Sequence, residues 1–122
     1  MQIKIKVNKT ISKLSIIVLL SPIFCQVLIN EYSASNLSWY TDNYQLEEDW
    51  IELYNTGSTE EDIGGYFLSD DPDEPAKWMI PGGTVIPADG YLVFWCSGRD
   101  EYSDNNYHTN FKLKQSKNNP DH

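Results

Sequence analysis

Turn-forming residues interrupt this chain about every ten residues, and that spacing limits what it can fold into. Pro-Gly-Gly, Gly-Gly, Asp-Gly and an acidic segment with two prolines separate short runs of apolar residues. No long run after the N-terminal segment has apolar side chains at helical spacing. Short strands between frequent turns predict an all-β fold, an antiparallel β-sandwich of the immunoglobulin type.

The clearest strand is predicted at Asp49–Asn55, where Ile51 and Leu53 alternate with outward positions 50, 52 and 54. The residues Tyr91–Cys96 are apolar on both faces, which predicts a central strand covered on both sides and paired at both edges. Further strands are predicted at 27–32, 66–69, 78–80, 84–86 and 109–113. Residues 97–106 are polar, and no strand is predicted there.

The first 25 residues have the pattern of a secretory signal peptide. Four lysines precede an apolar run, Leu14–Phe24, that is too short to span a bilayer. We expect residues 1–25 to be removed and residues 26–122 to form one domain. A lipid anchor on Cys25 is the alternative, although Phe24 stands where lipoprotein sites need a small residue.

Removal of the leader would leave 97 residues with five basic and 18 acidic side chains, a net charge of −13. Such a negative field repels phosphate backbones and anionic lipids, so neither nucleic acid nor a membrane surface is an expected partner. Cys96 would then be the only cysteine, which excludes an internal disulfide. Its position in an apolar strand predicts a buried structural residue.

Several segments, in their shared order, resemble the bacterial lamin-tail domain. They are Val27–Glu31, Asp49–Asn55, Gly65–Asp70, Lys77–Trp78, Ile80–Pro81, Val85–Pro87, Gly90–Trp95 and His108–Leu113. The resemblance runs from Val27 to about Ser116. It implies an immunoglobulin-like, non-catalytic module of longer secreted or surface-anchored proteins. The family pattern continues with a further strand beyond His122, so the resemblance also implies a sandwich that lacks its last strand or strands.

Three aromatic residues in the long polar loop, Trp39, Tyr40 and Tyr44, are candidate binding residues. Exposed rings stack on sugars or fill pockets of a protein partner. Alternatively, the loop folds back and these rings cover the open end of the sandwich.

The acidic turn supplies candidate calcium ligands, Asp70, Asp71, Asp73 and Glu74, because calcium prefers hard carboxylate oxygens. This spacing lacks the glycine and the distal glutamate of an EF-hand. A solvated acidic turn, partly neutralised by Lys77, is the competing interpretation. No other cofactor is expected.

No catalytic motif is present, although Glu31 and Glu52 on two strands invite comparison with an acid–base pair. We regard both as ordinary outward or hydrogen-bonded carboxylates, and we expect no enzyme. The sequence favours a secreted or cell-surface interaction module with a protein or glycan partner. The alternative is a carbohydrate-binding module that delivers an attached hydrolase to polysaccharide.

Overall fold

The structure is a computed structural model that describes residues 4–6, 26–37 and 40–114. Its strands, in chain order, are β1 (Lys4–Lys6), β2 (Val27–Ser33), β3 (Trp50–Asn55), β4 (Glu61–Asp62), β5 (Phe67–Ser69), β6 (Trp78–Met79), β7 (Val85–Ile86), β8 (Tyr91–Trp95), β9 (Glu101–Ser103) and β10 (Asn106–His108). None of the described residues belongs to a helix long and apolar enough to cross a bilayer.

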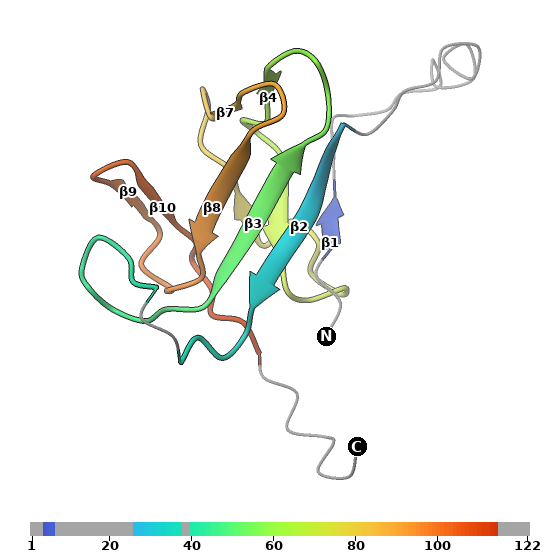
Figure 1. The fold of residues 1–122 in the computed structure, drawn as a ribbon. Coiled ribbons are helices and arrows are strands. Elements are labelled where there is room, and N and C mark those ends of the chain that lie inside the picture. The colour runs from blue at the N-terminus through green and yellow to red at the C-terminus, as the bar shows by residue number, and fades with distance from the viewer. Residues whose placement is uncertain (1–3, 7–25, 38–39, 115–122) are drawn as a thin grey trace, which may run out of the picture.

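The strands form a sandwich whose larger layer is a five-stranded sheet in the order β2-β3-β8-β10-β9 (Figure 1). Behind it lie β5 and β6, which belong to the three-stranded sheet β1-β5-β6, while β4 and β7 pair at one end. Pairing is antiparallel throughout, except that β10 runs parallel to β8. The predicted immunoglobulin-like all-β sandwich is confirmed.

The residues of β3 separate the interior from the outer surface. Ile51, Leu53 and Asn55 are buried, whereas the residues between them are only half-buried. β3 lies between β2 and β8, so its backbone is paired along both edges. The alternation predicted for this strand is therefore confirmed, and Ile51 and Leu53 face the core.

The core fills the space between the two layers with side chains from nearly every strand. β3, β5, β6, β7 and β8 all contribute, and residues after β10 close one end. Its buried members are Ile51, Leu53, Ile63, Leu68, Trp78, Ile80, Ile86, Phe94, Cys96, Phe111 and Leu113. Cys96 is a fully buried free thiol, as predicted, and burial raises its pKa far above the ordinary value.

A buried amide joins the end of β3 to two neighbouring segments. The Asn55 Nδ2 group contacts the carbonyl oxygens of Thr59, Ile86 and Pro87 at 2.8, 3.1 and 3.1 Å. Its Oδ1 accepts a hydrogen bond from the N–H of Gly57 at 2.9 Å. Asn55 thereby satisfies backbone groups that the short strands β4 and β7 cannot pair.

The end of the domain differs from the sequence prediction. Residues 109–113 do not form a strand; instead, β9 and β10 make a hairpin within a stretch expected to be a polar loop. Asp104 and Asn105 connect them with φ angles of 48° and 61°. Two such residues suit a type I′ hairpin turn, in which asparagine and aspartate tolerate positive φ.

A second difference concerns the predicted leader, which sequence analysis set apart from the fold. Lys4–Lys6 forms β1 and pairs antiparallel with β5, with Ile5 opposite Leu68. The rest of residues 1–25, including Cys25, lies outside the described residues.

The first prediction concerns the two faces of β3. Leu53→Ala should lower the free energy of unfolding by about 2–5 kcal/mol, because it removes buried methyl groups and leaves a cavity. Glu52→Gln is the matched control on the opposite face and should cost far less, since Asn30 Nδ2 can still donate to the retained carbonyl oxygen. Urea denaturation of both variants measures the difference. Equal losses would contradict the assigned faces.

Candidate interaction surface

One row of exposed apolar side chains crosses three strands on the outer surface of the five-stranded sheet. Tyr54 is the register partner of both Leu28 on β2 and Tyr91 on β8. The two tyrosine rings are stacked, with centroids 4.5 Å apart and planes 17° apart. Leu28 and Tyr91 remain 43% and 54% exposed. This row is therefore a preformed apolar surface that solvent reaches.

A hydrogen bond from its hydroxyl group fixes the ring of Tyr54 in the middle of this row. The hydroxyl donates this bond to Asp89 Oδ1, in the turn before β8. This bond to the carboxylate raises the pKa of Tyr54 above its ordinary value, with a smaller effect from burial. The tyrosine is therefore held neutral and oriented before any ligand arrives.

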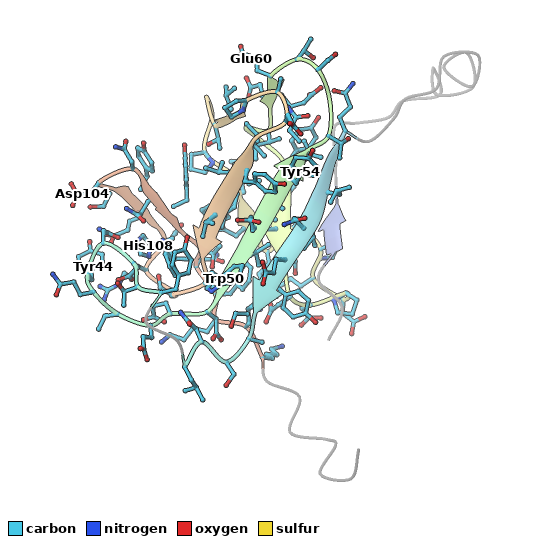
Figure 2. All side chains as sticks on the ribbon, viewed as in Figure 1. Tyr44, Trp50, Tyr54, Glu60, Asp104 and His108 are labelled. Atoms are coloured by element: carbon cyan, nitrogen blue, oxygen red, sulfur yellow. The ribbon has the colours of Figure 1, made fainter. Side chains whose placement is uncertain are left out.

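A second aromatic group lies at the other end of the same two strands. Trp50 and Trp95 are register partners, and the Tyr40 ring packs against both at centroid distances of 5.7 and 5.0 Å. Figure 2 shows Trp50 and Tyr54 at opposite ends of β3. Burial and the nearby Glu52 carboxylate raise the pKa of Tyr40. We call the two groups together, Leu28, Tyr40, Trp50, Tyr54, Tyr91 and Trp95, the outer aromatic face.

Buried polar side chains hold the long loop that carries Tyr40. Asn36 Nδ2 donates to the carbonyl oxygens of Tyr40 and Glu48 at 2.7 and 2.9 Å. Asp42 Oδ1 accepts from the N–H groups of Tyr44 and Leu46 at 2.8 and 3.0 Å. These bonds give a polar segment a defined conformation without regular secondary structure.

Tyr44, the next predicted binding residue, faces the β9–β10 hairpin and not the outer aromatic face. Arg99 lies over its ring at 4.2 Å from the centroid, and its hydroxyl donates to Glu101 Oε1. Tyr44 is still 41% exposed. The structure thus separates Tyr40 from Tyr44, and Trp39 lies outside the described residues.

A buried serine–histidine–asparagine chain lies beneath Tyr44, and sequence analysis missed it. His108 Nδ1 is 2.9 Å from Ser97 Oγ, and its Nε2 is 2.7 Å from Asn43 Oδ1. The order resembles a nucleophile, a base and an orienting group. However, His108 is fully buried and Ser97 nearly so. Because both groups are buried, we regard these hydrogen bonds as structural: they link the long loop to β10. The link depends on the contact between Asn43 and His108, which are far apart in the sequence.

The groups around His108 shift its pKa in opposite directions. Burial lowers its pKa, Arg99 lowers it further, and the carboxylates of Asp42, Glu101 and Glu48 raise it, with a net decrease. A neutral imidazole fits the hydrogen bonds, because Nε2–H can donate to Asn43 Oδ1 while Nδ1 accepts from the Ser97 hydroxyl.

Two of the four carboxylates of the acidic turn after β5 are engaged within the protein. Asp70 is buried and pairs with Lys77 at 2.8 Å, although its Oδ2 has no partner among the described residues. Asp71 accepts from the N–H of Asp73 and lies 3.3 Å from Lys114 Nζ, and both contacts lower its pKa. Asp73 and Glu74 are exposed. No three acidic, histidine or cysteine side chains in the described part of the chain are grouped to hold a metal ion. Calcium binding stays a prediction.

Glu31 and Glu52 are register partners on β2 and β3. Glu52 Oε1 accepts from Asn30 Nδ2 at 2.8 Å, beside the β-bulge that interrupts β2. Both carboxylates therefore lie between the two aromatic groups of the outer face.

Comparison with known proteins gives one family. The model of the Lamin Tail Domain matches residues 24–121, which is most of the chain. The chain belongs to the lamin tail domain family. A search of curated proteins and a search of solved structures each found no match. The resemblance inferred from the ordered motifs is therefore confirmed, and with it a family of immunoglobulin-like, non-catalytic modules that usually mediate interactions.

The second prediction concerns the pH dependence of this lamin tail domain. The pKa of His108 is lowered in the folded state from 6.5, so below that pH the unfolded chain binds the extra proton more readily. The contribution of His108 to stability is therefore complete above about pH 6.5 and decreases as the pH falls below it.

Thermal denaturation between pH 5 and 8 measures this effect. His108→Gln should be less stable than the unaltered chain at pH 8. It should lose less stability than the unaltered chain on acidification, because it has no imidazole to protonate. An identical pH profile for the two proteins would contradict this assignment.

Proposed function

We propose that this lamin tail domain is an extracellular, non-catalytic interaction module of a larger secreted or surface protein. We further propose that it binds a protein partner on the outer aromatic face. The observation that carries this proposal is the row Leu28–Tyr54–Tyr91, in which two exposed side chains, Leu28 and Tyr91, flank the half-buried Tyr54 across three strands. Tyrosine in such a setting supplies a large contact area at a small cost in conformational entropy.

The rigidity of this surface supports the proposal. Tyr54 and Tyr91 are stacked on strands at the centre of the larger sheet, and Tyr54 is hydrogen-bonded to Asp89. A partner would therefore bind an ordered surface and would not need to order it first. The neighbouring carboxylates of Glu31, Glu52 and Asp89 favour a partner whose rim is basic.

Carbohydrate binding is the second candidate, and Tyr40 is the observation that favours it. Its ring is 46% exposed and packs against Trp50 and the buried Trp95, so a sugar could stack on the exposed part of the Tyr40 ring. The mutual stacking of Tyr54 and Tyr91 favours protein binding instead, because each of these rings already has one face covered by the other.

The third prediction tests the surface. Tyr91→Ser should weaken capture of partners from the producing organism's secreted and envelope fractions by about tenfold or more, the effect expected for a central interface aromatic. Met79→Ser is the matched control, since Met79 is 58% exposed on β6, in the other layer. Equal capture by Tyr91→Ser and the unaltered protein would exclude the outer aromatic face as the binding site.

A glycan array run with the same proteins distinguishes the two candidates. Protein capture that depends on Tyr91, without glycan binding, supports the leading proposal. Glycan binding that is lost in Tyr40→Ser would instead support the carbohydrate-binding module.

The fourth prediction tests export. The lysine-rich start and the apolar run Leu14–Phe24 should direct the chain out of the cytoplasm. Mass spectrometry of exported material should find an N-terminus at or near Gln26. Exported protein that retains Met1 would contradict a cleaved leader, and a lipid-modified Cys25 would support the anchored alternative.

A further inference from the structure

At one edge of the smaller layer, β1 pairs with β5. β5 lies between β6 and β1, and its three residues pair antiparallel with Lys4–Lys6. On the ribbon, β1 lies at the side of the smaller layer, next to β5 (Figure 1). In the described residues, this edge is therefore occupied by a segment of the expected leader.

The backbone of β5 explains why this edge accepts a strand. The carbonyl oxygen of Tyr66 accepts from the N–H of Ile80 at 2.7 Å, so the carbonyl group of Tyr66 faces the segment that contains β6. Because backbone polar groups alternate along a strand, those of Phe67 and Ser69 face β1. Leu68 and Ser69 are almost completely buried. Without a strand at this edge, backbone groups beside the core would lose their protein partners, which is unfavourable where water has limited access.

We propose that the edge of β5 is a strand-acceptor site that, in the exported protein, binds an extended segment of a partner polypeptide antiparallel to Phe67–Ser69. The proposal rests on the proposed function, because removal of the leader would take β1 away. The added strand would pair with the backbone, as in other complexes formed by β-augmentation.

The chemistry of the partner segment follows from the strand that occupies the edge here. In β1 an apolar residue, Ile5, stands opposite Leu68, and lysines stand opposite Phe67 and Ser69. Asp70 and Asp71 follow β5 directly, and residues 26–122 carry far more acidic than basic side chains. An apolar residue between basic ones is therefore the segment that this edge accepts best. Because β5 offers only three residues, we expect the complex to be short-lived.

The fifth prediction tests the acceptor site in the full 122-residue chain with its leader retained. Lys6→Pro should disrupt β1, because Lys6 pairs with Phe67 through backbone groups that face β5, and proline has no N–H to donate to that pairing. Amide hydrogen exchange at Phe67 and Ser69 should then accelerate at least tenfold. Lys9→Pro, outside β1, is the matched control and should leave exchange at these two residues unchanged.

The probe is a synthetic peptide of residues 2–8, added to the Lys6→Pro chain. It should restore slow exchange at Phe67 and Ser69 and raise the melting temperature, whereas the same peptide with Lys6→Pro should do neither. The amides of Ile51 and Leu53 are followed in the same samples to detect global unfolding, and Lys6→Gly provides a milder variant if the proline variant unfolds.

Failure of the intact peptide to restore protection in both variants would overturn the acceptor site, as would unchanged exchange in the Lys6→Pro chain. Neither outcome depends on whether the leader is cleaved. N-terminal analysis of exported protein tests that separate point, so failure of the acceptor site and failure of the proposed export are distinguishable.

Discussion

The alternation of side chains along β3 is the constraint on which the rest of the structure depends. β3 pairs with β2 on one side and β8 on the other, so its two faces extend across three strands. Ile51 and Leu53 place one face in the core, and Trp50 and Tyr54 place the other in contact with exposed aromatic rings. A slip of one residue in register would exchange the core with the outer aromatic face.

Polar side chains stabilise the segments that the short strands leave without regular pairing. Asn55 satisfies carbonyl groups at one end of the sandwich. Within the long loop at the other end, Asn36 donates to carbonyl groups and Asp42 accepts from N–H groups. His108 joins that loop to β10 through Asn43. In a small domain whose described cysteine is a free thiol, such buried hydrogen bonds fix segments that hydrophobic burial alone would leave unspecified.

The sequence predicted what local patterns determine. Alternation identified β3 and its inward residues, apolar residues on both faces identified β8 as central, and ordered motifs identified the family. The predicted burial of β8 was only partly right, because Tyr91 is exposed and stacks on Tyr54. That difference matters for function, since it turns an expected interior position into part of the outer aromatic face.

Contacts between distant segments could not be predicted from those patterns. The β9–β10 hairpin depends on positive φ at Asp104 and Asn105, within a stretch whose composition suggested only a loop. The Ser97–His108–Asn43 chain joins residues up to 65 positions apart, and neither its serine nor its asparagine stands out in the sequence. Tyr40 and Tyr44 were grouped as loop aromatics, yet packing directs them to different strands.

Hydroxyl-radical footprinting of the full chain tests most directly whether the larger sheet has one buried and one exposed face. β8 suits this test because it carries both exposed and buried aromatic residues. The account predicts rapid oxidation at Tyr91, which is 54% exposed, and strong protection of Phe94, which is fully buried three residues later. Tyr54 should react at an intermediate rate, since it is half-buried beside Tyr91. Comparable oxidation of Phe94 and Tyr91 would contradict a sheet that has one face in the core and its outer aromatic face in solvent.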